Sequence, residues 1–192
     1  LLTPELLSIQ NKSGDTPLHI LAKKDNFDLI PKDLLTSELL SLHANGRNLL
    51  HTLAEEGNFH LIPKELLTPE LLTPELLSIQ NYKGDTLLHI LAQTGQFDQI
   101  PKELITPEFL SIQNVEGDTP LGILAREGNF DQIPKEFLTH DRLSIQNRNG
   151  KTPLQLLVYE GNFDQFPKEI LTPELLSIQD ENGDTLLHIL AY

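Results

Sequence analysis

Histidine is the residue type whose spacing in this chain most suggests chemistry. Four of the seven histidines share one slot of a recurring phrase: His19, His51, His89 and His188. The other two copies of the phrase hold Gly122 and Gln155 in this slot. An imidazole can bind a metal ion or move a proton near neutral pH, so a repeated histidine could mark a site.

The helices expected to carry these histidines limit that chemistry. Packed helices lie about 8 to 10 Å apart, whereas a metal–nitrogen bond is about 2 Å long. Histidines of neighbouring copies therefore cannot coordinate one metal ion, and we expect a structural role for the slot. The other three histidines are isolated and expected to be solvated: His43, His60 and His140.

Other catalytic groups are missing from the sequence. The carboxylates recur at helix starts, where they suit the helix dipole better than acid–base work. There is no GxSxG, no glycine-rich phosphate loop and no metal-spaced cluster. Without cysteine there is no thiol nucleophile and no thiolate metal site. We therefore predict a protein that is not an enzyme, with no catalytic residues, no metal and no cofactor.

The phrase that carries the histidines begins at a glycine and recurs with a period of 33. Its six copies start at glycines spaced by 32, 38, 33, 33 and 33 residues: Gly14, Gly46, Gly84, Gly117, Gly150 and Gly183. A fixed period of this size indicates a repeat array. We predict one array over 1–192, with partial repeats 1–13 and 183–192 around repeats 14–45, 46–83, 84–116, 117–149 and 150–182.

Each copy reads as a turn followed by a short helix. A threonine, or Asn48 in one copy, stands at the capping position, and Pro17, Pro120 or Pro153 fits the first helical position. Leucine and alanine then recur at helical spacing and form an apolar stripe that faces the core, as Leu18, Leu21 and Ala22 do. The helices are expected to end at glycines, with Asp25 standing in once: Gly57, Gly95, Gly128 and Gly161.

The rest of each copy is predicted to be a broken second helix. Phenylalanines recur in register as an expected packed ladder: Phe27, Phe59, Phe97, Phe130 and Phe163. A proline inside a long helix would cost about 3 kcal/mol. We therefore predict that a new helix begins at each proline of the recurring PK pair: Pro31, Pro63, Pro101, Pro134 and Pro167. LTPELLSIQN follows, as one short helical turn and an extended return. Each repeat should thus hold three short helical pieces.

One phrase is doubled. LTPEL appears twice in succession between Leu66 and Glu75, which accounts for the spacing of 38. Each copy carries its own capping threonine and its own proline, so each is a closed unit. We predict a local bulge on the second-helix side, with normal stacking of the first helices before and after it. Deleting Leu71 to Glu75 is expected to preserve the fold and nearly all stability.

The chain resembles ankyrin repeats, which have a 33-residue period and the phrase TPLHxA. Thr16 to Ala22, TPLHILA, is the closest match, and the likeness covers essentially the whole chain. It implies an all-α solenoid of ankyrin-like repeats with β-turn and extended connections, and histidines that bond a neighbouring turn. The chain departs from that pattern at Leu21 and its equivalents, where alanine is usual, and in the broken second helix. Leucine-rich repeats are the main alternative, but their period is about 20 to 29 and they lack TPLH.

The negative charge lies mainly on the positions that recur from repeat to repeat. The formal net charge is −14, which opposes nucleic-acid binding because phosphate neutralisation needs a continuous basic surface. No apolar run of about 18 residues exists to span a membrane. The slots that vary between repeats are the turn residues and the end of the first helix, and Lys151 and Glu181 also belong to them. We predict that these slots hold the partner-binding residues: Lys12, Lys23, Lys24, Arg47, Glu55, Glu56, Tyr82, Lys83, Val115, Glu116, Arg126, Glu127, Arg148, Tyr159 and Glu160.

The sequence therefore favours a protein–protein interaction module that binds a protein partner through its turns and first helices, as the resemblance implies. Drift between repeats would also produce the variation. Two alternatives stay open: a structural segment that associates end to end through uncapped terminal repeats, and a recruiting domain of a larger effector enzyme. The native compartment stays open, with an intracellular location the simpler expectation.

Overall fold

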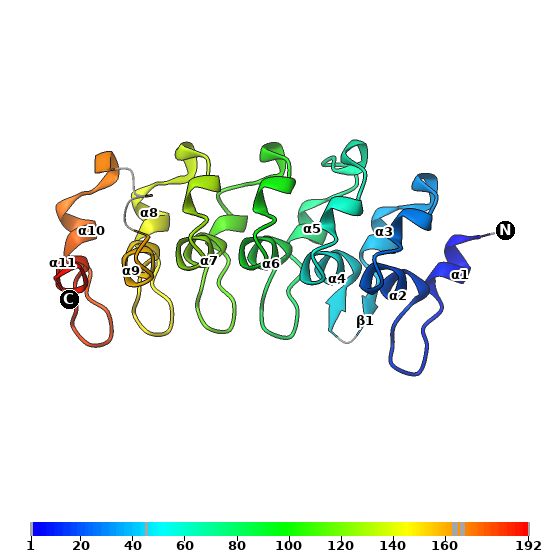
Figure 1. The fold of residues 1–192 in the computed structure, drawn as a ribbon, viewed down its shortest axis with the longest axis horizontal. Helices are drawn as coiled ribbons and strands as arrows, with labels where there is room; N and C mark the ends of the chain where they lie inside the picture. The colour runs from blue at the N-terminus through cyan, green and yellow to red at the C-terminus, as the bar shows by residue number, and fades with distance from the viewer. Residues whose placement is uncertain (1, 45, 163–164, 166–167, 192) are drawn as a thin grey trace. The chain divides into compact units, whose positions relative to one another are not determined.

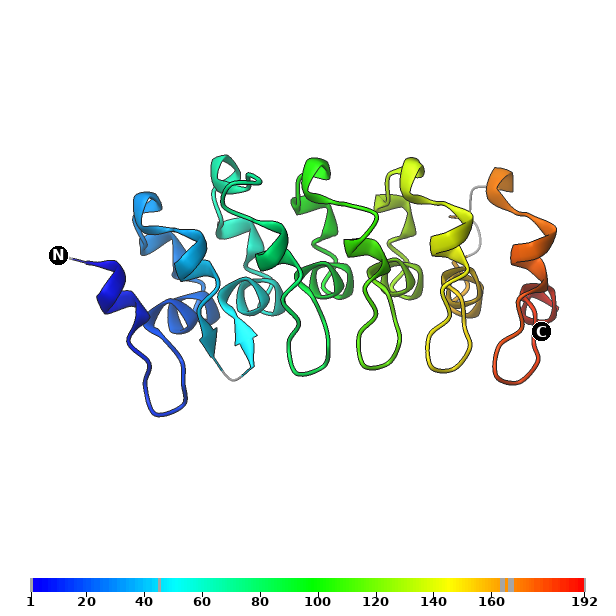
Figure 2. The same cartoon turned by 180° about the vertical axis from the view of Figure 1, so that it is seen from behind.

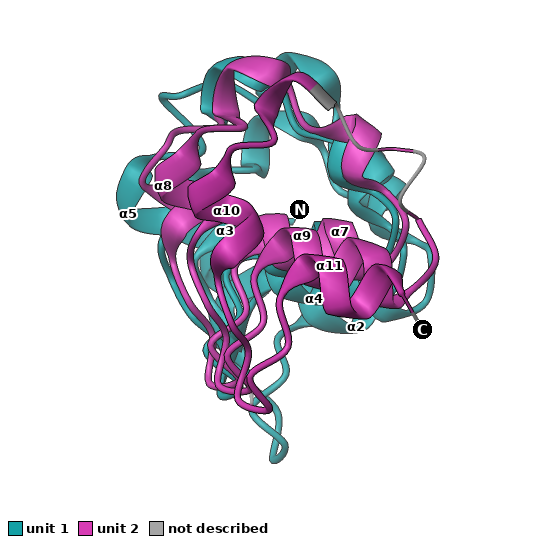
Figure 3. Ribbon diagram, turned by 90° about the vertical axis from the view of Figure 1, so that its left-hand side faces the viewer, with its two compact units in different colours: residues 1–104 teal, residues 105–192 magenta. Residues whose placement is uncertain are grey.

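The structure, a computed structural model, describes residues 2–44, 46–162, 165 and 168–191. It divides into two compact units, residues 1–104 and 105–192, which Figure 3 distinguishes by colour. Each unit is built from the repeats read in the sequence and is described by itself. The single array over 1–192 stays a prediction.

The recurring phrase forms a short inner α-helix in every copy. In unit 1 these helices are α2 (Pro17–Lys23), α4 (Leu49–Glu55) and α6 (Leu87–Gln93), and in unit 2 they are α7 (Pro120–Arg126), α9 (Pro153–Tyr159) and α11 (Leu186–Leu190). Within each unit, successive inner helices pack side by side (Figures 1 and 2). The all-α fold class is confirmed, and the connections between helices are turns and extended segments.

The predicted helix signals are also confirmed. The Thr16 hydroxyl accepts a hydrogen bond from the backbone N–H of His19, and Pro17 is the first helical residue. Asn48 caps α4 in the same way. Asp25, with φ of 56°, has the left-handed conformation that glycine takes at the end of the other complete inner helices.

The outer layer consists of short pieces rather than one helix. The one-turn 3₁₀ helices are η1 (Phe27–Leu29), η2 (Lys32–Leu34), η3 (Phe59–Leu61), η4 (Lys64–Leu66), η5 (Phe97–Gln99), η6 (Lys102–Leu104), η8 (Phe130–Gln132), η9 (Lys135–Phe137) and η11 (Lys168–Ile170). The LTPEL segments and their variants form α1 (Pro4–Ser8), α3 (Ser37–Leu40), α5 (Pro74–Leu77), α8 (His140–Leu143), α10 (Pro173–Ser177) and the 3₁₀ helix η7 (Phe109–Ser111). A described repeat such as 14–45 therefore holds four helical pieces, and the prediction of three was wrong because it missed the turn at Phe27.

The second 3₁₀ helix begins one residue later than predicted in the repeats of Pro31, Pro63 and Pro134. Pro31 precedes η2 with ψ of 131°, and Pro63 and Pro134 do the same at η4 and η9. Each is a capping residue rather than the first helical residue. The reason is local: the Pro31 carbonyl accepts the first 3₁₀ hydrogen bond, 3.0 Å from the backbone nitrogen of Leu34.

The core lies between the inner helices and the outer pieces. The phenylalanines at the start of the outer layer are each at most 1% exposed: Phe27, Phe59, Phe97 and Phe130. Phe163, the fifth member predicted, lies outside the described residues. Leu53, Leu91, Leu124 and Leu157, which occupy the slot where alanine was expected, are fully buried as well. The larger leucine therefore fills space between the layers.

The doubled phrase adds one turn to the outer layer. The backbone nitrogen of Leu72 donates to the Thr68 carbonyl at 2.8 Å in the first copy, and the second copy forms α5. Helices α4 and α6, before and after this insertion, still pack against each other, which confirms the predicted stacking. Leu72 is only 1% exposed. The inserted turn therefore contributes to the core, which the prediction of a nearly cost-free deletion did not allow for.

Candidate partner-binding face

The predicted binding residues lie on the turns and on the last turn of the inner helices, which we call the turn–helix face. Asn81 shows how each turn is built: its Oδ1 accepts from the backbone N–H groups of Lys83 and Asp85, both at 2.9 Å. Its backbone nitrogen donates to the Asp85 carbonyl, also at 2.9 Å. The same bonds form around Asn11, Asn114, Asn147 and Asp180. The turn after Ala44 is shorter and forms a two-stranded hairpin, β1 (His43–Ala44) with β2 (Arg47–Asn48).

These turns hold their tip residues outward. Tyr82 is 66% exposed and Val115 is 42% exposed, and both follow the asparagine that closes the turn. A turn whose backbone bonds are already made can keep its backbone conformation without a partner, so little backbone entropy would be lost on binding. The tips thus have the exposure expected of binding residues.

In unit 2 the turns are also joined sideways. The backbone nitrogen of Arg148 donates to the Glu116 carbonyl at 2.9 Å, and that of Glu181 donates to the Asn149 carbonyl at 3.1 Å. Gly150, with φ of 71°, lies so close to the next turn that a Cβ atom there would be 2.7 Å from the nitrogen of Glu181. Glycine is needed here both for its backbone angle and for the close approach of the turns.

Side chains in the histidine slot bond to the caps of their inner helices, and in α9 also to the next turn. In α4 the backbone N–H of Asn48 donates to Nδ1 of His51 at 3.2 Å, so the neutral ring carries its proton on Nε2. Gln155 fills the same slot in α9: its Oε1 accepts from the backbone nitrogen of Thr152, and its Nε2 donates to the carbonyls of Ile178 and Asp184 at 3.1 and 3.0 Å. The bonds of Gln155 support the predicted structural role of the slot.

Burial keeps two of these rings neutral. The side chains of His19 and His51 are fully buried, and loss of solvation lowers the pKa of each to about 4. The carbonyl of Ile79 faces the His51 ring and partly offsets this effect on its pKa. Nε2 of His51 nevertheless has no partner in good hydrogen-bonding geometry among the described residues. His188 in α11 is exposed, as are His43, His60 and His140.

Several predicted binding residues are engaged within the protein. The residue after the turn glycine contacts the residue eight positions later: Asp15 binds Lys23 at 2.9 Å and Asp118 binds Arg126 at 2.5 Å. Arg47 and Glu55 form the same contact with the charges reversed. Arg47, Glu55 and Arg126 are consequently only half exposed, whereas the other twelve predicted residues are exposed. The sequence carries a signal for this pairing, the charge reversal at a spacing of eight, which the prediction did not use.

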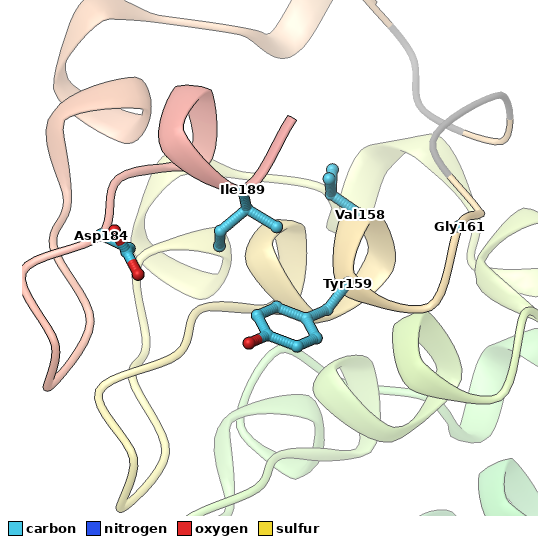
Figure 4. A pocket seen from close by; sticks show the side chains of 5 residues that line it. All are labelled: Val158, Tyr159, Gly161, Asp184 and Ile189. Atoms are coloured by element: carbon cyan, nitrogen blue, oxygen red, sulfur yellow. The ribbon is translucent and has the colours of Figure 1, made fainter. Parts of the chain in front are cut away.

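The last such pair replaces the ion pair by a cation–aromatic contact. Lys151 stands after the glycine, and its ammonium lies 3.4 Å from the centroid of the Tyr159 ring. Beside Tyr159 is a cavity of about 340 Å³, lined by Val158 and Gly161, and by Asp184 and Ile189 (Figure 4). The prediction named Tyr159 but none of the other four lining residues.

The described residues offer no other obvious chemistry. Over 2–44, 46–162, 165 and 168–191 no three histidine, aspartate or glutamate side chains gather as metal ligands would. Across the same ranges, every helix is too short or too polar to cross a membrane.

Comparison with known proteins rests on structure rather than sequence. No family model and no curated protein matches the chain. The crystal structure of the ankyrin repeat domain of Bcl-3, "a unique member of the IkappaB protein family", matches 95% of this chain and 81% of its own length, with a TM-score of 0.65 and 18% sequence identity. The chain has the ankyrin-repeat fold. Within that fold its distinguishing feature is the proline-broken outer layer of one-turn helices.

Proposed function

We propose that this ankyrin-repeat chain is a non-catalytic module that binds a protein partner through its turn–helix face. The observation that carries the proposal is the placement of varied, exposed side chains on hydrogen-bonded turns and at the last turn of the inner helices. Tyr82 and Tyr159 are 66% and 57% exposed. Aromatic side chains at such positions are favourable anchors because they bury large area and lose little rotamer freedom.

Chemistry of the face supports protein over nucleic acid as the partner. Lys23, Arg47 and Arg126 are already paired with carboxylates of the same chain. They therefore have less to gain from phosphate groups than free cations would, and the net charge of −14 opposes a polyanion further.

Matched substitutions test the face. The purified chain serves as bait for a lysate of its source cells, and captured proteins are compared between variants. Tyr82→Ala and Tyr159→Ala should lose proteins that the parent chain captures, whereas Lys64→Ala, Lys102→Ala and Lys135→Ala on the outer layer should keep them. Arg126 is left intact because its loss would also remove its ion pair with Asp118. Equal losses from both sets, or losses from the outer set alone, would move the binding site away from the turns.

A second function, self-association, is favoured by two apolar surfaces. In unit 1, Leu6 is 51% exposed, although its equivalent Leu39 is only 4% exposed under the preceding repeat. In unit 2, Leu187 is 57% exposed, while its equivalent Leu154 is 1% exposed. We propose that copies of the chain can cover these surfaces end to end. Sedimentation over a range of concentrations should show association that Leu6→Glu and Leu187→Glu abolish, and a concentration-independent monomer would refute it. A role as the recruiting domain of a larger enzyme stays a hypothesis.

A further inference from the structure

The cavity beside Tyr159 is where unit 2 departs most from its own repeat pattern. The slot of Val158 holds a fully buried alanine in four other copies: Ala22, Ala54, Ala92 and Ala125. Val158 is larger and only partly buried. Tyr159, next to it, stands in a slot that is charged or amidic in those copies. These two residues of α9, with Ile189 of α11, give the cavity an apolar wall (Figure 4).

Asp184 supplies the charge on the opposite side of the cavity. Its equivalents Asp15 and Asp118 are each neutralised by a cation eight residues later. The residue eight positions after Asp184 is Tyr192, which cannot supply a cation. Among the described residues, Asp184 forms no ion pair, and Lys151 contacts the Tyr159 ring instead. Asp184 thus lacks the counter-ion that Asp15 and Asp118 have.

The surroundings add to this unbalanced charge. Asp180 and Glu181 belong to the same turn as Asp184. A cation that enters the cavity would therefore approach through a negative field, which favours its association over that of a neutral or acidic group.

We propose that this cavity binds a lysine or arginine side chain of a protein partner. The aliphatic stem would lie against Val158 and Ile189, and the cationic head would pair with the carboxylate of Asp184. This inference rests on the proposed function of the turn–helix face and assigns one chemical class of contact to it. A lysine or arginine side chain can make both contacts at once, because it buries its methylene groups while its charge stays at the rim of the cavity.

A random dodecapeptide library displayed on phage provides the probe. Peptides retained by the parent chain should be enriched in lysine or arginine at one position. When they are synthesised and titrated, Asp184→Asn should weaken their binding by about tenfold or more, since a charge-assisted contact is lost. Tyr159→Ser, a second exposed position, should weaken it as well. Asp15→Asn is the matched control, because the Asp15 carboxylate already forms an ion pair with Lys23. This substitution should leave peptide binding unchanged. Circular dichroism of each variant checks that it is folded.

The outcomes separate this inference from the proposed function. Peptides without basic enrichment that lose binding on Tyr82→Ala would overturn the cavity's preference and leave the turn–helix face as the binding site. Peptides that bind Asp184→Asn as tightly as the parent chain would also overturn it, as would a library from which no peptide is retained.

Discussion

Acidification should destabilise this protein through its buried histidines before its carboxylates protonate. Burial lowers the pKa of His51 to about 4 in the folded chain, and an exposed histidine has a pKa of about 6.5. Between these values the unfolded chain binds a proton that the folded chain does not. Stability therefore rises with pH across this window, and it is lost as the pH falls from about 6.5 towards about 4.

The size of the effect follows from the two pKa values. At about pH 5, one such ring costs about 2 kcal/mol of unfolding free energy relative to neutral pH, and the limit below pH 4 is about 3 kcal/mol. His19, whose pKa is lowered to the same value, should add a similar loss. The structural cause is specific: Nδ1 of His51 accepts from the backbone N–H of Asn48, so a proton on Nδ1 would set one donor against another and break this bond of the α4 cap.

Glutamine offers the matched substitution, because Gln155 occupies this slot in α9 and makes the same capping bond. Urea unfolding followed by circular dichroism at about pH 7 and about pH 5 measures the loss. His51→Gln should reduce the pH-dependent loss by about 2 kcal/mol relative to the parent chain. His60→Gln, at an exposed ring in η3, should leave the loss unchanged. If His51→Gln loses stability as steeply as the parent chain, the buried neutral ring is not the cause.

Two further predictions concern stability at neutral pH. Deletion of Leu71 to Glu75 should leave a folded chain that is about 2 kcal/mol less stable, because the buried side chain of Leu72 is lost. Thermal unfolding measures this loss of stability. A chain that fails to fold would show that the inserted turn is essential. Gly122→Gln should stabilise unit 2 by at least about 1 kcal/mol through helix propensity, since a Cβ at Gly122 meets only ordinary contacts of 3.5 and 3.6 Å. Gly122→Ala should give the propensity gain alone. Equal effects of both substitutions would show that glutamine does not also make the capping bond that Gln155 makes in α9.

Features that depend on neighbours in the chain could be predicted from the sequence. The caps at Thr16 and Asn48 and the left-handed Asp25 are set by contacts within a few residues, so their signals are local. The period of 33 predicted that the inner helices would stack, because equal segments present equal faces. Placement of the prolines was predicted less well, since a one-turn 3₁₀ helix and an α-helix begin with similar residues.

The candidate site was only partly accessible from the sequence. Variation between repeats located the exposed tips Tyr82 and Val115, because a turn residue that need not pack is free to differ. It did not reveal that Arg47 and Arg126 are held by carboxylates eight residues away, since a turn must first fold back over its helix for them to meet. Variation alone cannot distinguish a residue that is available to bind a partner from one whose charge is reversed together with that of the residue it pairs with in the same chain.

The sequence by itself determined the repeat, the inner helices and the positions that differ, because each follows from local propensity and from counting. Only the tertiary structure decided which of those positions are available. Stacking of α9 and α11 places Val158, Tyr159 and Ile189 around one cavity and leaves Asp184 at its edge without the counter-ion that Asp15 and Asp118 have. Residues about 25 positions apart in the chain share that cavity because neighbouring repeats pack in register, and this proximity arises only when the repeats are folded together.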